Sequence, residues 1–348
     1  MKNKNRYFAR RVSRAGSLVL LCCWALPVSA QLRVLVTNDD GAGAEGISVL
    51  VEELRKNPNL DITVVAPAGE QSGSGDATSS PIDVTAAFTA AGYPATAVAG
   101  EPADSVLVAV LELLPQPPDL VISGINDGRN IGRDLAPFSG TVGAARWAAR
   151  LGVPAIAASQ ERGPAPDYQT TAEYVAALAQ LLANDKMQGT ETIPFDAGDG
   201  QGTQIVLSIN VPNCPGTLKG FRVVALGSLT SPESYTLISD DGTTQTYGLN
   251  EVTNVSLGGC DSPMTDPVTD VDALFNGFAA ITPLTESLGI SVPDPDDYAV
   301  LESVGQAAGG AMELKLPGGG SVLGAGSLGL LLLGAALGVW RSRRAGRL

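Results

Sequence analysis

The sequence predicts an α/β fold in which a mostly parallel sheet is covered by helices on both faces and is followed by a strand-rich C-terminal extension. Between residues 33 and 182, short apolar runs alternate with longer stretches whose apolar residues recur at helical spacing. Alternating strands and helices favour a parallel sheet. From Ile205 onward the apolar runs have the length of strands. Apolar residues make up 44% of the 348 residues, enough for a large core.

The first strand is expected at residues 33–36, a short apolar run that leads into polar residues. A helix over residues 45–56 follows, and Asn57-Pro58-Asn59 ends it. Its apolar residues share one face: Ile47, Leu50, Val51 and Leu54. The next strand, at residues 62–66, stops at Pro67 because proline cannot donate to a strand ladder.

The same pattern then repeats along the chain. Residues 97–99 form a weak apolar run, whereas residues 120–122 are strongly apolar. Further strands are therefore expected at 97–99, 120–122 and 155–158, and further helices at 104–114, 140–151 and 168–182.

The C-terminal third has a different composition. Residues 186–203 are rich in Gly, Thr and Asp and predict a loop, and strands are expected at 205–208 and 221–225. Residues 228–262 are polar and rich in Thr and Ser, which is compatible with a hairpin or an excursion from the domain. Residues 285–316 are predicted to be a linker.

The two ends of the chain are predicted to be targeting segments. Residues 1–30 combine a basic start, an apolar run from Leu18 to Leu26 and small residues at Val28-Ser29-Ala30, as a signal peptide does; an uncleaved anchor is the alternative. Residues 317–348 place a glycine-rich stretch before an apolar segment and four arginines. This layout resembles the GlyGly-type C-terminal sorting tails of Gram-negative bacteria, and the alternative is a plain membrane anchor. We therefore expect an exported protein, in the periplasm, in the cell envelope or secreted.

The charge and the absence of histidine exclude several functions. The chain carries 22 basic and 36 acidic residues, a net charge of −14, so it would repel nucleic acid. It would also repel a phosphate ester unless a cation or local arginines reverse the field. The sequence contains no histidine, which excludes Ser-His-Asp hydrolysis and histidine-ligated zinc. Metal chemistry based on oxygen ligands, which suits magnesium or manganese, is still available.

The adjacent carboxylates of Asp39 and Asp40 are the most specific indication of a functional site in the sequence. They follow the first strand, and two neighbouring carboxylates repel each other unless a cation or a proton lies between them. A divalent metal would relieve this repulsion, although Asn-Asp-Asp-Gly is also a common turn sequence.

Other polar residues are predicted to lie at the same edge of the sheet. Ser72 follows the second strand, and Asn126 and Asn130 follow the strand at 120–122. Ser139-Gly140-Thr141 begins a predicted helix, where backbone N–H groups attract anions, although a simple N-cap is the alternative. Arg129 and Arg133 are basic residues nearby, either countering the negative charge or exposed to solvent.

Cys214 and Cys260 lie in the body of the chain. In an oxidising compartment they would form one disulfide, and two free buried thiols are the alternative.

The motifs in order resemble the SurE family of 5′/3′-nucleotidases from about Arg33 to Leu284. The resemblance is carried by residues 36–41, 64–67 with 71–73, 100–104, 119–126 with Asn130, 138–145, 209–212, 219–220, 269–270 and 281–284.

This resemblance implies a Rossmann-like three-layer phosphatase domain over residues 31–284, with one divalent metal ion, magnesium or manganese. It implies hydrolysis of nucleoside 5′- and 3′-monophosphates and assembly into a homodimer or tetramer. By position, Asp39 and Asp40 would be the catalytic residues and, with Ser72 and Asn126, the metal ligands. The residues expected to bind substrate are Asn38, Asn130, Ser139, Gly140 and Thr141. An inactive binding protein at the cell envelope is the competing interpretation.

Overall fold

The computed structural model describes residues 31–163, 165–196, 204–214, 218–240, 243–253, 259–285 and 298–308. The predicted signal peptide at residues 1–30 and the predicted tail at 317–348 lie outside these residues. Within the part described, no helix is long and apolar enough to cross a membrane.

The main sheet of the described residues has nine strands in the order β3-β4-β2-β1-β5-β6-β7-β11-β8. Most neighbours are parallel; β3 and β4 are antiparallel, as are β7 and β11. The strands are β1 (Leu32–Thr37), β2 (Leu60–Pro67), β3 (Val84–Phe88), β4 (Pro94–Val98), β5 (Leu120–Asp127), β6 (Ala155–Gln160), β7 (Val206–Val211), β8 (Phe221–Val223) and β11 (Ala279–Leu284).

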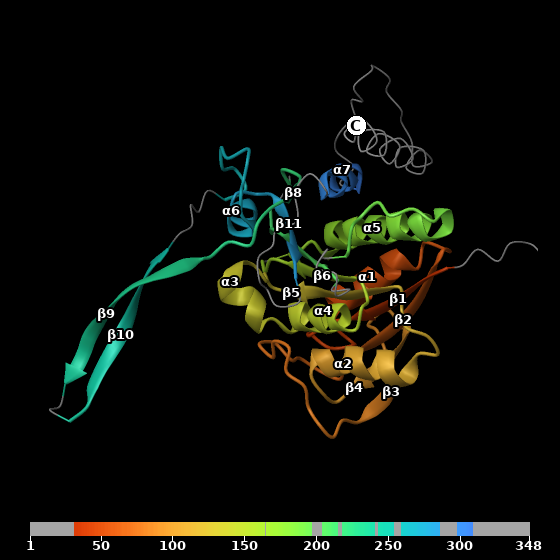
Figure 1. The fold of residues 1–348 in the computed structure, drawn as a ribbon, viewed down its shortest axis with the longest axis horizontal. Coiled ribbons are helices and arrows are strands. Elements are labelled where there is room, and N and C mark those ends of the chain that lie inside the picture. The colour runs from red at the N-terminus through yellow and green to blue at the C-terminus, as the bar shows by residue number, and fades with distance from the viewer. Residues whose placement is uncertain are drawn as a thin grey trace, which may run out of the picture.

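Helices cover both faces of this sheet, so the predicted three-layer fold is confirmed (Figure 1). One face carries α1 (Glu45–Leu54), α5 (Tyr168–Gln188) and α7 (Ala299–Ala308), and the other carries α2 (Pro102–Val108) and α4 (Gly140–Arg150). The strand alternation explains the two cores: Val34 and Val36 are buried with the first set of helices, and Leu35 is buried with the second. The short helices α3 (Gly132–Leu135) and α6 (Asp270–Phe275) complete the domain.

Two helices differ from their predicted bounds for local reasons. Pro102 occupies the first turn of α2, and Glu101 with Asp104 forms a capping box, so the helix starts before residue 104. A π-helix, Ala109–Leu113, follows it. The long helix α5 continues to Gln188, into the segment predicted to be a loop, and ends where Gly189 adopts a left-handed conformation with φ of 66°.

The predicted linker at residues 285–316 contains α7, and this helix belongs to the folded domain. Tyr298, Leu301 and Val304 are buried against the core. The Tyr174 hydroxyl donates to the backbone oxygen of Leu301 at 3.0 Å. The apolar spacing of Leu301 and Val304 is that of one helix face, which explains why the segment docks.

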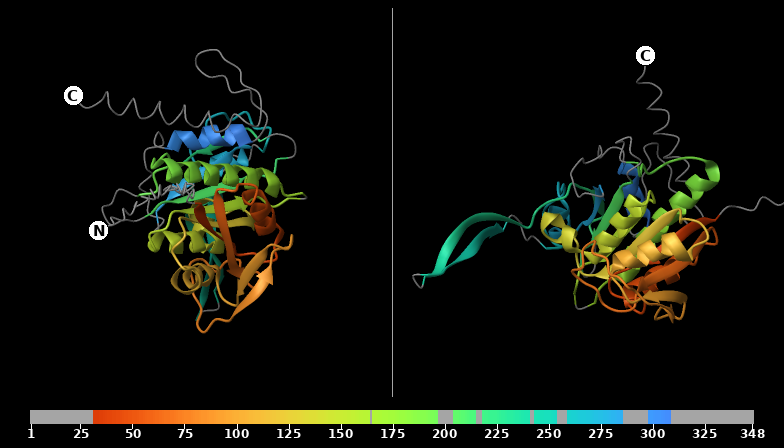
Figure 2. Two further views of the ribbon diagram at one scale, coloured as in Figure 1. Left: turned by 90° about the vertical axis from the view of Figure 1, so that its right-hand side faces the viewer. Right: turned by 60° about the horizontal axis from the view of Figure 1, so that its bottom comes forward.

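Residues 228–262, for which the sequence was compatible with a hairpin or an excursion, contain a separate antiparallel two-stranded sheet of β9 (Thr230–Asp240) and β10 (Gln245–Thr253). It projects away from the domain in Figure 1 and in the right-hand view of Figure 2. Leu237 and Ile238 are exposed on it, at 45% and 68%.

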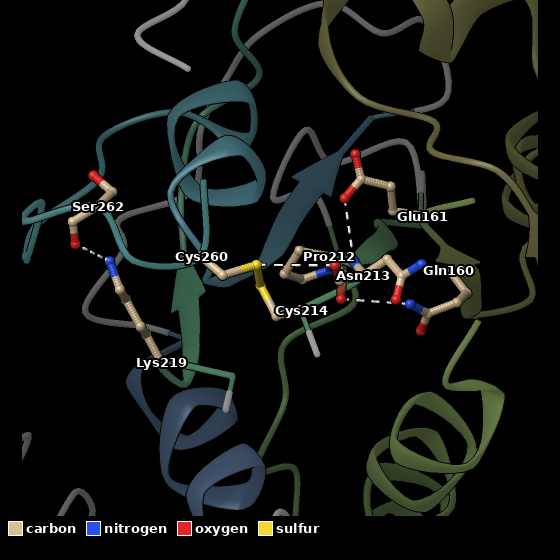
Figure 3. The surroundings of a disulfide bond; sticks show 8 residues. All are labelled: Gln160, Glu161, Pro212, Asn213, Cys214, Lys219, Cys260 and Ser262. Carbon is tan, nitrogen blue, oxygen red and sulfur yellow. Dashed lines mark hydrogen bonds between the residues drawn. A yellow bond between two sulfur atoms is a disulfide. The ribbon is translucent and has the colours of Figure 1, made fainter. Parts of the chain in front are cut away.

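A disulfide joins Cys214, just after β7, to Cys260, with a Cα–Cα distance of 5.6 Å (Figure 3). The sequence left open a disulfide or two free buried thiols, and the structure has the disulfide. It connects segments that are 46 residues apart and encloses β8 and the hairpin between them.

Candidate functional site

The predicted site residues gather at the carboxyl ends of β1, β2 and β5. The chain runs from β1 outward through β2 to β4 and then returns to β5 on the other side of β1. The strand order therefore reverses between β1 and β5, and in open α/β sheets ligands bind in the crevice at such a point. Asp39 follows β1 directly, and Asn126 lies near the end of β5.

A pocket of about 470 Å³ opens at this edge. Its lining brings together five predicted site residues: Asp39, Ser72, Asn126, Asn130 and Ser139. The remaining lining residues are Gly73, Asp127, Gly128, Arg129, Leu135, Phe138, Glu161 and Arg162. The pocket therefore combines an oxygen-rich set of ligands with apolar side chains and two arginines.

Asp39 is held in place by the start of α4. Its side chain is 3% exposed, and its carboxylate accepts a hydrogen bond of 2.6 Å from the Thr141 hydroxyl. Burial raises the pKa of Asp39 above its usual value, and the bond from Thr141 opposes this shift. The Asp39 backbone oxygen also accepts from the Gln71 amide at 2.8 Å, which ties the loop containing Ser72 to the end of β1.

Asp40 is anchored on the other side, because its carboxylate accepts from the Asp127 backbone amide at 3.0 Å. Burial and the nearby charge of Asp39 raise the pKa of Asp40 to about 7. Two neighbouring carboxyl groups thus share a poorly solvated position, where a cation would favour the ionised forms. Asp40 is outside the lining of the pocket.

The residue types at the site fit a hard divalent cation. Asp39 and Asp40 offer carboxylate oxygens and Ser72 a hydroxyl. The Asn126 amide nitrogen donates to the Gly128 backbone oxygen at 2.8 Å, which leaves its amide oxygen as the available ligand. Such oxygen ligands suit magnesium or manganese. Within the described residues, no group of three or more Asp, Glu or Cys side chains is arranged to hold a metal.

Three residues predicted to bind substrate, Asn38, Gly140 and Thr141, are not among the residues that line the pocket. The Asn38 side chain is fully buried and exchanges two hydrogen bonds with the backbone of Gly41, at 2.9 and 3.2 Å, so it shapes the turn that carries the two aspartates. Thr141 is also fully buried, and its hydroxyl contacts Asp39. Gly140 provides space, because an added Cβ would lie 2.9 Å from the Asp39 Cβ.

A second glycine allows α4 to approach the loop after β2. A Cβ on Gly143 would lie 1.8 Å from the backbone oxygen of Gly75. The Gly75 amide in turn donates to the Phe138 backbone oxygen at 3.0 Å. The start of α4, capped by the Ser139 hydroxyl on the Val142 amide, is therefore packed against the same loop that contains Ser72.

Asn130 belongs to a buried polar network that the sequence did not reveal. Its amide nitrogen donates to the Thr141 hydroxyl at 3.2 Å and to the Ser159 hydroxyl at 2.9 Å. Its backbone amide donates to the Asn210 side-chain oxygen at 2.7 Å. Asn210 and Ser159 come from β7 and β6. The sequence signal that could have found this network is an asparagine, Asn210, inside the apolar strand 206–211.

The chain is similar in sequence and in fold to known proteins. Residues 34–232 match the family model described as Survival protein SurE. A protein of Syntrophobacter fumaroxidans named 5′-nucleotidase SurE is 35% identical over 260 residues, which are 74% of this chain and 94% of that protein. A protein of Photorhabdus laumondii named 5′/3′-nucleotidase SurE is 35% identical, over 74% of this chain and 91% of that protein. The crystal structure of the SurE protein from Aquifex aeolicus is 27% identical, with a TM-score of 0.56, over 79% of this chain and 99% of that one.

Proposed function

The chain belongs to the SurE family, and we propose that it is a divalent-metal-dependent nucleotidase that hydrolyses nucleoside 5′- and 3′-monophosphates outside the cytoplasm. Its relatives are named 5′-nucleotidases and 5′/3′-nucleotidases, so the chain is a phosphoric monoester hydrolase. The observation that carries the proposal is the meeting of Asp39, Ser72 and Asn126 on the wall of one pocket, at the strand-order reversal of the sheet.

The metal ion would be held by Asp39, Asp40, Ser72 and Asn126. Once bound, a magnesium or manganese ion supplies Lewis-acid polarisation of the phosphoryl group and lowers the pKa of a water molecule. The protein contributes fixed positions for these ligands: Thr141 holds Asp39, the Asp127 amide holds Asp40, and Gly128 orients the Asn126 amide. Held ligands lose little conformational freedom when the cation binds.

The substrate phosphate would lie at the start of α4, beside Ser139 and Asn130. Both residues line the pocket, and the first backbone N–H groups of a helix attract an anion. The exposed ring of Phe138, at 66%, and the half-buried Leu135 provide apolar surface for the nucleoside at the same opening. The arrangement thus offers a polar end for the ester and an apolar wall beside it.

The extracytoplasmic location is part of the proposal. Disulfides persist in oxidising compartments, and the bridge between Cys214 and Cys260 supports such a location. Export by the first thirty residues, membrane attachment by the C-terminal tail and assembly into a homodimer or tetramer remain our inferences from the sequence.

The test is metal-dependent phosphate release by the purified protein from a panel of nucleoside monophosphates and other phosphomonoesters, with the Asp39→Asn variant beside it. We expect release with Mg²⁺ or Mn²⁺, none with EDTA, and little from the variant. A folded protein that releases no phosphate with any divalent cation would instead support the inactive binding protein at the cell envelope.

A further inference from the structure

The arginine at position 129 has surroundings that the metal site does not explain. Arg129 lines the pocket together with Asp39 and Ser139, and its side chain is 40% exposed. Arg133, the other basic residue singled out from the sequence, is exposed and outside the pocket lining. Arg129 is therefore the one of the two that faces the site.

Two contacts hold the Arg129 guanidinium at the pocket wall. Its Nη1 atom donates to Glu161 Oε1 at 3.0 Å, and the guanidinium lies 4.8 Å from the centre of the Phe275 ring. Glu161 takes one N–H group, and within the described part of the chain no other residue accepts from this guanidinium. Four of its five N–H groups are therefore available to a ligand in the pocket.

The disulfide joins the two segments that provide these contacts. Asn213, next to Cys214, donates its backbone amide to Glu161 Oε2 at 3.1 Å (Figure 3). The Glu161 carboxylate therefore bridges the Arg129 guanidinium and the loop that contains Cys214.

Cys260 belongs to the segment that leads into α6, the helix that ends at Phe275. Gly277 packs directly on this cysteine, because an added Cβ would lie 3.0 Å from the backbone of Cys260. The disulfide thus fixes the loop whose Asn213 amide holds Glu161 relative to the segment that leads into α6 and Phe275.

Resting on the nucleotidase function proposed above, we infer that Arg129 binds the substrate phosphate and that Glu161 and the Cys214–Cys260 disulfide position it. A guanidinium is planar and binds phosphate oxygens through two parallel N–H groups, provided that it is held in the correct orientation. Together with Arg162, it also supplies positive charge to a pocket whose acidic lining residues are Asp39, Asp127 and Glu161.

The experiment measures AMP binding by calorimetry in EDTA, where no hydrolysis is expected, alongside KM and kcat for phosphate release with Mn²⁺. Arg129→Ala should raise the Kd and KM for AMP about ten-fold, equivalent to about 1.4 kcal/mol, with kcat changed less. The matched control is Arg55→Ala, because Arg55 also pairs with a carboxylate, Glu52 at 2.9 Å, and lies over an aromatic ring, Tyr93 at 5.6 Å, but lies away from the pocket. This control should leave both constants unchanged.

The positioning role gives a result opposite in sign to a purely electrostatic one. Glu161→Gln removes a negative charge from the pocket, which by charge alone would tighten AMP binding. If Glu161 positions Arg129, the same variant weakens binding. One carboxylate oxygen becomes an amide nitrogen that cannot accept a hydrogen bond, so either the bond from Arg129 or the bond from Asn213 is lost. Tighter binding by this variant would overturn the inference.

A double-mutant cycle tests the disulfide. Replacing Cys214 and Cys260 by alanine should weaken AMP binding in the wild-type background and have little further effect in the Arg129→Ala background. Equal losses in both backgrounds would show that the bridge does not act through Arg129 and would overturn that part.

The outcomes separate this inference from the proposed function. Phosphate release with Arg129→Ala indistinguishable from wild type would leave the nucleotidase function intact and overturn the inference. If AMP binding depends on Arg129 but no phosphate is released, the inference holds and the nucleotidase function is overturned. A wild-type protein that neither binds nor hydrolyses AMP would overturn the inference and the nucleotidase function together.

Discussion

Thr141 donates its hydroxyl hydrogen to Asp39 across 2.6 Å, although the two residues are 102 positions apart in the chain. The same hydroxyl accepts from Asn130, which is itself held by Asn210 and Ser159. Three elements, α4, β6 and β7, together with the loop after β5, thus fix one carboxylate. Asn130 and Thr141, which the sequence suggested as substrate contacts, thus also support the Asp39 carboxylate.

Removing the Thr141 hydroxyl tests this support. We expect Thr141→Val to lower kcat/KM about 10- to 100-fold, because a hydrogen bond to a charged group contributes about 1.5–3 kcal/mol. Thr141→Ser keeps the hydroxyl and should retain most of the activity. Steady-state kinetics with AMP and Mn²⁺ would measure both, and equal activity of the valine and serine variants would contradict the role.

Metal binding should be visible in thermal stability without any substrate. A ligand at about 100 times its Kd stabilises the folded state by about 2.7 kcal/mol, so saturating Mn²⁺ should raise the Tm of the wild type by roughly 5 °C or more. The Asp39→Asn variant, which keeps the shape but loses a charged ligand, should show little rise. Differential scanning calorimetry with and without EDTA makes the comparison, and an equal rise in the variant would place the metal elsewhere.

The raised pKa of Asp40 predicts the pH dependence of the metal-free protein. Its carboxyl group titrates near 7 in the folded state, against about 3.8 when unfolded, so between these values the folded state binds the extra proton. Stability without metal should therefore fall as the pH rises from about 4 to 7.

Two comparisons check this assignment. Asp40→Asn should flatten the pH dependence and be more stable than the wild type near pH 8, and Mn²⁺ should bind the wild type more weakly as the pH falls below 7. Urea unfolding in EDTA at several pH values would reveal the slope. A slope identical in the variant would show that another group causes it.

Gly143→Ala should damage both stability and activity. Alanine favours a helix over glycine by about 1 kcal/mol, but the new methyl group would lie 1.8 Å from the Gly75 backbone oxygen. Overpacking of this kind costs about 1–3 kcal/mol, and moving the loop at Gly75 would also disturb Ser72. Gly43→Ala is the control, because nothing lies within 4 Å of its added Cβ. Urea unfolding would measure the free energy of unfolding of both variants, and steady-state kinetics their kcat/KM. Equal values for Gly143→Ala and Gly43→Ala would contradict the prediction.

Asp119, which directly precedes β5, should stabilise the folded protein at neutral pH. Burial opposes its ionisation, but hydrogen bonds from Arg33 and Lys186 outweigh this and hold the pKa of Asp119 well below its usual range. The folded state therefore gains stability above the unfolded pKa near 4 and loses it as the pH falls further. Asp119→Asn should cost about 1–3 kcal/mol at pH 7 and less at pH 3, as measured by urea unfolding.

Periodicity in the sequence was sufficient to predict the α/β class and most of the elements. All seven predicted strands overlap observed strands, and the helices over 45–56 and 140–151 appear close to their expected places, because apolar spacing decides which face of each element is buried. It also placed Asp39 and Asn126 at one edge of the sheet, since parallel strands end together. Periodicity did not predict the strand β3 or the helix α7. Val84–Phe88 is mostly exposed, and α7 was hidden in a segment that appeared to be a linker.

The roles of the individual site residues depended on tertiary contacts. From the sequence alone, Asn38, Asn130, Ser139, Gly140 and Thr141 were equivalent polar or small residues near a predicted anion site. Only the fold separated the residues that line the pocket from those that do not, and only the fold brought Asn210, Glu161 and the Cys214–Cys260 bridge toward the same site. The physical reason is the distance along the chain over which each effect acts. Hydrophobic periodicity is a local property of the chain, whereas hydrogen bonds between residues far apart in sequence exist only after the strands have packed side by side.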